Sequence, residues 1–248
     1  MECRRWSSGC AHKLSSACSA LSFGERGGRT VLTAARAELP LVIQRPLYGP
    51  AGQAVVVLLT PAGALFDGDA LRLEVRCEPG TDVTLASAAA TKLNRCDRSC
   101  IRFDLDVHVS DGAVFRYLPY ELIPFRGTRY TQTIRLHLQP DARAWLLEVV
   151  AAGHGRLDFD TQVRGPSALL ARERFDLSAS NVDQLRGYTH YGSLLLFGCE
   201  AAESINARLA RIPPRGIAGR LDAPQRRCRP EDARRGGTIG ARKPAGRR

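Results

Sequence analysis

The sequence predicts a mostly β fold of stacked or coiled antiparallel strands in a β-helix-like arrangement, with one or two short helices. The clearest evidence is segment 101–110, where apolar and polar residues alternate and so face opposite sides of a sheet. The alternation recurs at 71–77 and 134–138, and each run is followed by a turn and a second apolar run. This strand–turn–strand unit repeats roughly every 30 residues, which favours stacked layers, although the strands of an ordinary β-sandwich also alternate.

The chain divides into three parts along its length. Residues 1–28 are rich in Ser, Cys and Gly without clear periodicity, and we expect a flexible leader there. Residues 29–210 form the expected β domain, with the best helical pattern at 201–210. Residues 211–248 are basic and rich in Pro, Gly and Arg, with too little apolar surface to offset the entropy cost of ordering, so we expect a disordered tail. Further strands are expected at 31–37, 41–45, 54–60, 83–85, 114–117, 145–147, 169–177 and 193–198.

The formal net charge of +11 is concentrated at the two ends of the chain. Residues 211–248 hold 12 Lys and Arg against 3 Asp and Glu, and residues 1–30 hold 5 against 2. The body, 31–210, has 19 basic and 20 acidic residues and is close to neutral. Its basic residues form no stripe interleaved with aromatic residues, so the sequence does not predict nucleic-acid binding by the body. Nucleic-acid binding through the tail is therefore the alternative function.

Two features bear on the cellular compartment. No segment approaches the ~20 apolar residues that span a bilayer, and the first 28 residues lack the continuous apolar stretch of a signal peptide. We therefore expect a cytoplasmic protein. The eight cysteines could form disulfides, but reduced thiols are expected in that compartment.

The chain contains none of the common short catalytic motifs, such as a nucleophile elbow, a P-loop or a His-Glu-x-x-His helix. His108 and His137 fall on the polar faces of expected strands and are interpreted as solvent-exposed. Cys96 and Cys100 have poor spacing for a zinc site and lack a second pair. The turn at 67–69 could hold a hard cation, but Asx-type hydrogen bonding within a tight turn is the commoner explanation. We therefore expect that the protein is not an enzyme. A third hypothesis is a β-barrel or sandwich enzyme whose active site is assembled from residues far apart in the sequence.

Several short blocks of sequence carry a resemblance to a known family. The blocks are 28–32 (GRTVL), 44–48 (QRPLY), 61–69 (PAGALFDGD), 89–92 (AATK), 117–121 (YLPYE) and 145–153 (WLLEVVAAG), with a fainter trace at 192–195 (GSLL). In their order and spacing they resemble the urease accessory protein family UreD, also named UreH, over 28–200.

The resemblance implies a mostly β, non-enzymatic factor in urease maturation. It implies binding to apo-urease and to the accessory proteins UreF and UreG, and passage of transient Ni²⁺ through the interior, with no tightly bound metal or cofactor. A passage needs groups that hold the ion weakly, whereas a storage site needs several strong N or S ligands around one point. The nickel-path candidates are the carboxylates at motif positions, Asp69, Glu121 and Glu148. The positions with expected structural or interface roles are Arg45, Pro46, Gly63, Gly68, Thr91, Lys92 and Pro119.

The chain also departs from the family pattern. Most of the family's usual C-terminal portion is replaced by the basic tail. The substituted motif positions are Ala64 and Asp67 in place of glycine, Leu93 and Asn94 in place of an aromatic pair, Tyr120 in place of Gln and His154 in place of Arg.

Overall fold

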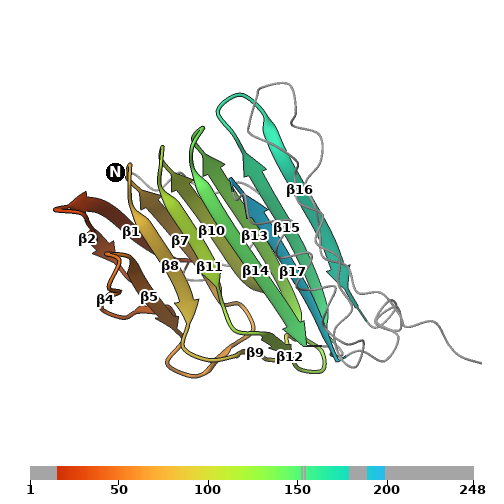
Figure 1. Ribbon diagram of the computed structural model, residues 1–248. Coiled ribbons are helices and arrows are strands. Elements are labelled where there is room, and N and C mark those ends of the chain that lie inside the picture. The colour runs from red at the N-terminus through yellow and green to blue at the C-terminus, as the bar shows by residue number, and fades with distance from the viewer. Residues whose placement is uncertain (1–15, 152, 154, 179–188, 199–248) are drawn as a thin grey trace, which may run out of the picture.

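The computed structural model describes residues 16–151, 153, 155–178 and 189–198, which fold into two facing β-sheets (Figure 1). These residues form 17 strands and no helix, so the expectation of a mostly β protein is confirmed and that of short helices is not met within this part of the chain. The helix expected at 201–210 and the tail at 211–248 lie outside the described residues. Among the residues described, no helix is long and apolar enough to cross a bilayer.

The first sheet, sheet A, has seven strands in the order β16-β15-β13-β10-β7-β1-β2. Its five inner strands run parallel to one another, and only the edge pairs β1–β2 and β15–β16 are antiparallel. The strands of sheet A are β1 (Ser16–Arg26), β2 (Arg29–Arg36), β7 (Ala70–Cys77), β10 (Ile101–Val109), β13 (Arg129–Leu138), β15 (Arg156–Arg164) and β16 (Leu169–Leu177).

The second sheet, sheet B, is built around the parallel strands β5, β8, β11 and β14. β17 pairs with β14 in the antiparallel direction, and the short strands β12, β9 and β6 extend the sheet at one end. The strands of sheet B are β3 (Val42–Ile43), β4 (Leu47–Tyr48), β5 (Ala54–Leu59), β6 (Ala64–Leu65), β8 (Asp82–Ser87), β9 (Thr91–Leu93), β11 (Val114–Leu118), β12 (Leu122–Pro124), β14 (Arg143–Ala151) and β17 (His190–Phe197).

The repeated unit expected from the sequence forms one coil of a β-solenoid. In each unit one strand lies in sheet A and the next lies in sheet B, as in the pairs β7–β8, β10–β11 and β13–β14. Leu73, Leu105 and Ile134 occupy matching places in successive coils. The prediction of antiparallel stacking is wrong, because the two strands of a unit do not pair with each other; each pairs in parallel with its counterpart in the next unit.

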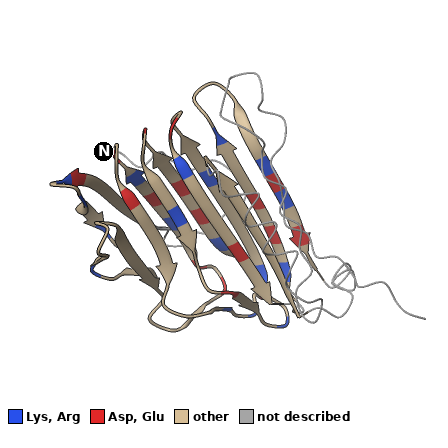
Figure 2. Ribbon diagram, viewed as in Figure 1, with Lys and Arg blue, Asp and Glu red and all other residues tan. Residues whose placement is uncertain are grey.

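The hydrophobic core fills the space between the sheets. Leu73, Leu105 and Ile134 from sheet A and Leu85 and Phe115 from sheet B are fully buried there. The outward positions of the same strands carry many of the charged residues, seen as bands along the ribbons in Figure 2. The period of two in the sequence therefore separates the core from the charged outer faces.

The N-terminal boundary differs from the expected one. Residues 16–26 form β1, which lies between β7 and β2, so the prediction of a flexible leader over 1–28 is wrong for this segment. Leu21 and Phe23 of β1 are buried in the core. Only two of the apolar residues in this segment are large, so the local signal is weak, and the strand is fixed by pairing with β7.

Candidate functional site

A cavity of about 70 Å³ lies between the two sheets, at the end where β5, β8 and β11 finish. By volume it has room for a few water molecules. Its walls combine apolar side chains such as Leu71 and Phe103 with polar groups that point inward from both sheets. The polar lining comes from Thr60, Ser87, Thr91, Tyr117, Tyr120, Tyr130, Gln132 and Glu148.

A buried chain of hydrogen bonds leads from this cavity across the interior. The Tyr130 hydroxyl donates to Gln132 Oε1 over 2.7 Å, and Gln132 Nε2 donates to Glu148 Oε1. Gln132 lies on β13 of sheet A and Glu148 on β14 of sheet B, so the second bond joins the two sheets. All three side chains are buried, and such polar groups are stable in a core only when they are hydrogen-bonded to one another.

Glu148 has an unusual ionisation state as a result. Glu148 is only 5% exposed, and burial raises the pKa of its carboxyl to about 8. The nearby Glu173 also raises this pKa, whereas hydrogen bonds from Gln132 and Thr161 lower it. The carboxyl is therefore mainly protonated at neutral pH. Burial also raises the pKa of Tyr117 and of Tyr130, so both phenols stay neutral.

The polar groups continue beyond Glu148 toward the last strands of both sheets. Ser193 on β17 is the register partner of Glu148 on β14. The Ser193 hydroxyl donates to Glu173 Oε2 over 3.0 Å, and the Tyr191 hydroxyl donates to Glu173 Oε1 over 3.3 Å. We call the set from the cavity to this edge the interior polar row; it consists of Tyr130, Gln132, Glu148, Thr161, Ser193, Glu173 and Tyr191.

The three nickel-path candidates lie in different places. Glu148 lies on the interior polar row. Asp69 Oδ2 accepts a hydrogen bond from the Phe66 amide at 2.8 Å, as expected for a turn, and Asp69 does not line the cavity. Glu121 is half-buried in the loop before β12, where its carbonyl accepts from the Thr91 amide at 3.0 Å, and it does not line the cavity either.

The other motif residues divide between the cavity and the surface. Thr91 and Pro119 line the cavity, together with Tyr120, which stands at a position substituted relative to the family pattern. Of the rest, Arg45 and Lys92 are exposed, Pro46 is half-buried, Gly63 and Gly68 have φ of +64° and +90°, and His154 lies outside the described residues.

Asp67 organises the loop that follows β9. Its carboxylate accepts hydrogen bonds from the backbone amides of Asp97, Arg98 and Ser99, at 3.0, 2.8 and 2.8 Å. Gly68 supplies the positive φ of the turn, which is costly for other residues. Asp69 therefore bonds within the turn, as the turn interpretation of 67–69 predicts, whereas Asp67 holds the amides of a distant loop, which that interpretation did not include.

Most of the interior polar row was missed in the sequence, although a signal exists. Gln132 interrupts an apolar series on β13 between Tyr130 and Ile134, and Thr161 does the same on β15. A polar residue at an inward position of an alternating strand is a mark of a buried polar group. Ser193 and Glu173 become part of the row only through strand pairing, which the pattern of one strand does not reveal.

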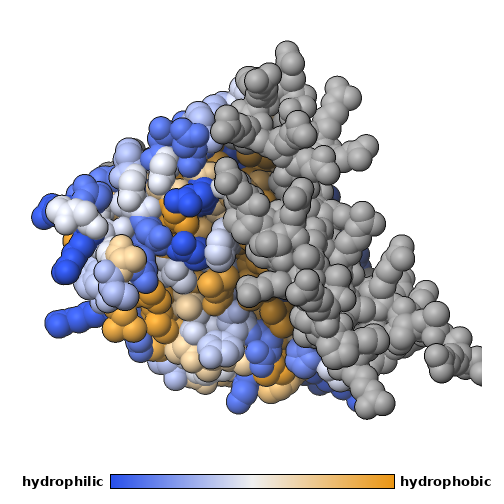
Figure 3. All heavy atoms as spheres, viewed as in Figure 1, coloured by the Kyte–Doolittle hydropathy of each residue, from blue (hydrophilic) through white to orange (hydrophobic). Residues whose placement is uncertain are grey.

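Three exposed aromatic residues lie beside the short strands at the cavity end. Phe66, Tyr120 and Phe125 are 50, 58 and 43% exposed and follow β6, β11 and β12. Figure 3 shows more apolar residues toward the end of the viewed face where β9 and β12 lie. Exposed apolar groups of this kind are common where proteins bind partners.

Comparison with known proteins agrees with the resemblance described from the sequence blocks. A sequence model of the UreD urease accessory protein family matches residues 15–237. The chain is 31% identical over 177 residues to urease accessory protein UreD of Pseudomonas putida (strain GB-1), a match covering 68% of this chain and 64% of that protein. It is 38% identical over 144 residues to UreD of Chromohalobacter salexigens, covering 54% and 46% of the two chains. It is 32% identical over 214 residues to UreD 2 of Streptomyces griseus, covering 81% and 72%.

These matches cover less than two thirds of the length of the Pseudomonas and Chromohalobacter relatives. The family match nevertheless includes every strand that surrounds the cavity and the interior polar row. The chain belongs to the UreD family of urease accessory proteins.

Proposed function

We propose that this protein is a non-enzymatic scaffold in urease maturation. In this proposal it binds apo-urease and the accessory proteins UreF and UreG in the cytoplasm, and it passes Ni²⁺ toward urease through the interior polar row. The observation that carries the proposal is the hydrogen-bonded pair Gln132–Glu148, which brings a carboxyl group into the core between the cavity and the β16–β17 edge.

The composition of the row suits a moving ion better than a stored one. Its ligand atoms are carboxyl, amide and hydroxyl oxygens, and no cysteine or histidine belongs to it. Oxygen ligands bind Ni²⁺ less tightly than imidazole or thiolate, so an ion held by them can leave. Conduction requires binding that is weak and spread over several sites.

The raised pKa of Glu148 supports the same proposal. A protonated carboxyl gives up its proton when a divalent cation approaches, because the cation stabilises the charged form. Glu148 and Glu173 also disfavour each other's negative charge, and a cation between them relieves that repulsion. The Glu148 carboxyl is therefore mainly protonated in the absence of cargo and becomes anionic as the ion passes.

The exposed aromatic residues at the cavity end provide a candidate surface for the partner. Phe66, Tyr120 and Phe125 expose apolar area after β6, β11 and β12, and Tyr120 also lines the cavity. Aromatic side chains with one polar end are enriched at protein interfaces. A partner bound there covers the cavity mouth and receives or supplies the ion without its release into solvent.

The test is urease activation in cells that lack their resident UreD-type protein and express this chain instead. We expect urease activity to be restored, with apo-urease and UreF co-purifying with the chain. Glu148→Gln keeps the size and hydrogen bonds of the side chain but cannot bind the cation as a carboxylate, so we expect full assembly with lower activity. Asp69→Asn and Glu121→Gln provide the comparison with path candidates outside the row.

Each result has a distinct meaning. Failure of the wild-type chain to assemble with apo-urease contradicts the scaffold role. Normal nickel loading by the Glu148→Gln variant contradicts the route through the row while leaving the scaffold role intact. If Asp69→Asn or Glu121→Gln lowers nickel loading more than Glu148→Gln does, the nickel route lies outside the interior polar row.

A further inference from the structure

Three metal-ligating side chains meet on the outer face of sheet A. Asp106 and His108 are two residues apart on β10, and side chains at that spacing point to the same face of a strand. His137 on β13 is the register partner of His108, so the parallel pairing of β10 and β13 places the two imidazoles side by side. The cluster is thus created by strand register, on the opposite face of the sheet from the interior polar row.

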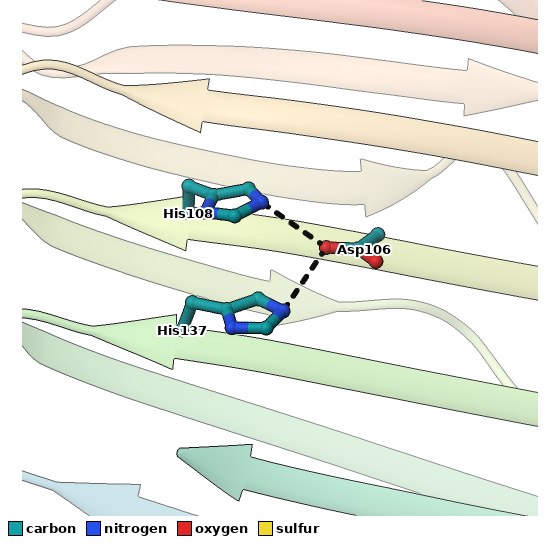
Figure 4. A group of neighbouring side chains, drawn as sticks. All are labelled: Asp106, His108 and His137. Atoms are coloured by element: carbon teal, nitrogen blue, oxygen red, sulfur yellow. Dashed lines mark ion pairs between the residues drawn. The ribbon is translucent and has the colours of Figure 1, made fainter. Parts of the chain in front are cut away.

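The ligand atoms of the three residues converge on one point. Nε2 of His108 and Nε2 of His137 each lie 3.4 Å from Asp106 Oδ1, and the three donor atoms all lie within 4.8 Å of one another (Figure 4). The imidazole rings are stacked, with centroids 4.4 Å apart and an interplanar angle of 7°. Asp106 Oδ1 is out of contact with solvent and has no well-formed hydrogen bond, which is costly for a carboxylate oxygen.

These separations match those within a metal coordination sphere. Two ligand atoms about 2.1 Å from a metal and at a tetrahedral angle are about 3.4 Å apart. The His–Asp separations therefore need little change to bind an ion, whereas the two rings must tilt out of their stack so that both nitrogen lone pairs point at the same centre. Three protein ligands leave at least one position for water or for a group of a partner.

We propose that Asp106, His108 and His137 bind a late first-row divalent cation, such as Zn²⁺ or Ni²⁺, on the outer face of sheet A. Two imidazole nitrogens and one carboxylate favour this class of ion over Mg²⁺ or Ca²⁺, which prefer oxygen ligands. An ion here also satisfies Asp106 Oδ1.

The charged surroundings limit the affinity without preventing binding. Arg76 on β7, Arg135 on β13 and Arg164 on β15 lie beside the cluster in the strand register, and their charge opposes a cation. Glu74, the register partner of Asp106, carries the opposite charge. Burial lowers the pKa of His137, and so do His108, Arg164 and Arg135, while Asp106 opposes the change.

This site does not depend on the proposed nickel route, and the two can be tested separately. The cluster lies on the outer face of the sheet, where His108 is 52% exposed in its side chain and can receive an ion directly from solvent. Substitutions at Glu148 are expected to leave it unchanged.

The test is calorimetric titration of the full chain with Zn²⁺ at pH 7.5, with a phosphine reductant to keep cysteines reduced. We expect His108→Asn and His137→Asn each to lose one equivalent of Zn²⁺ binding, or to weaken it at least tenfold. His190→Asn, which changes an exposed histidine on β17, is the matched control and keeps the wild-type isotherm. Any Zn²⁺ binding by cysteine residues is the same in all variants, so it does not affect the difference between them.

A second measurement guards against effects on folding. In the wild-type chain with ¹⁵N-labelled histidine, Zn²⁺ is expected to shift the Nε2 resonances of His108 and His137 together and to leave that of His190 in place. Unchanged Zn²⁺ stoichiometry and affinity in both variants, or absence of these shifts, overturns the proposal and leaves the cluster as a histidine–carboxylate ion pair only.

Discussion

Gln132 on β13 and Glu148 on β14 form a hydrogen bond that spans the interior from one sheet to the other. Each residue occupies an inward position that an apolar side chain fills elsewhere on its strand. The pair thus places an ionisable group in the core, where burial holds the carboxyl of Glu148 in its protonated form near pH 7. Both the stability of the protein and its proposed role in nickel transfer depend on this arrangement.

The first prediction concerns the pH dependence of stability. The pKa of Glu148 is raised from the ordinary 4.5 to about 8, so the native state binds an extra proton between these two values. Stability therefore falls as pH rises through this window. A glutamine at position 148 does not ionise, so the stability of Glu148→Gln does not carry this pH dependence. The free energy of unfolding of Glu148→Gln minus that of wild type is therefore expected to increase by about 1–4 kcal/mol between pH 5 and pH 8.

Urea denaturation of both proteins across this pH range measures the effect. Glu121→Gln is the control, because Glu121 lies outside the interior polar row. A difference between Glu148→Gln and wild type that does not vary with pH means that Glu148 is already ionised in the folded protein.

The second prediction concerns the core between the sheets. Leu105 is fully buried and lies between Leu73 and Ile134 in neighbouring coils. Leu105→Ala is expected to lower the free energy of unfolding by about 2–5 kcal/mol, because it removes apolar contacts and leaves a cavity. Arg76→Ala, an exposed change on β7, is expected to alter it by less than about 0.5 kcal/mol. Equal effects of the two substitutions in denaturant unfolding contradict the solenoid core.

The third prediction concerns the loop held by Asp67. The backbone amide of Arg98, followed by those of Ser99 and Asp97, lowers the pKa of the Asp67 carboxyl, although burial opposes this. Asp67→Ala removes these acceptors, so hydrogen exchange of the three amides is expected to become several-fold faster. Asp67→Asn keeps one acceptor oxygen, so its amide exchange rates are expected to lie between those of wild type and of Asp67→Ala.

The sign of the pH effect follows from the lowered pKa of Asp67. The protection is present above the ordinary pKa of 3.8 and is lost as pH falls through the folded value. Amide exchange at 97–99 that is the same in wild type and Asp67→Ala shows that the loop is held by other contacts.

The fourth prediction concerns cysteine reactivity. Burial raises the pKa of Cys77 to about 12, so almost no thiolate forms at pH 8. Cys100 is half-buried, and its thiol is more accessible. Under native conditions iodoacetamide is expected to modify Cys100 well before Cys77, as measured peptide by peptide in a mass spectrometer. Denaturation in urea should make the two rates similar; faster labelling of Cys77 in the native protein would contradict its burial.

The sequence predicted the strands well because the alternation of apolar and polar residues shows which side chains face a core. In this protein the core lies between two sheets, so each strand has one buried face and one exposed face. Segments 71–77, 101–110 and 134–138 all correspond to strands of sheet A. Alternation does not report strand direction, since parallel and antiparallel pairing bury the same side chains. The parallel coils were therefore missed, although the even spacing of the units pointed to stacking.

The candidate site was predictable only in part, for the same reason. Glu148 was identified through its motif block, and its inward position between Leu146 and Val150 is visible in the sequence. Its contacts with Gln132 and Glu173 come from other strands and depend on register and on the distance between the sheets. The pairing of His108 with His137 likewise becomes apparent only when β10 and β13 are aligned.

We propose that Ni²⁺ crosses this protein through the interior polar row, and the Glu148→Gln variant removes the carboxylate on which that route depends. Purified complexes of apo-urease and its accessory proteins, assembled with wild type or variant, are loaded with nickel, and metal in the urease site is measured over time. We expect the variant complex to assemble as fully as the wild-type complex and to deliver nickel at least tenfold more slowly. Delivery at the wild-type rate from a fully assembled variant complex would contradict the proposed route.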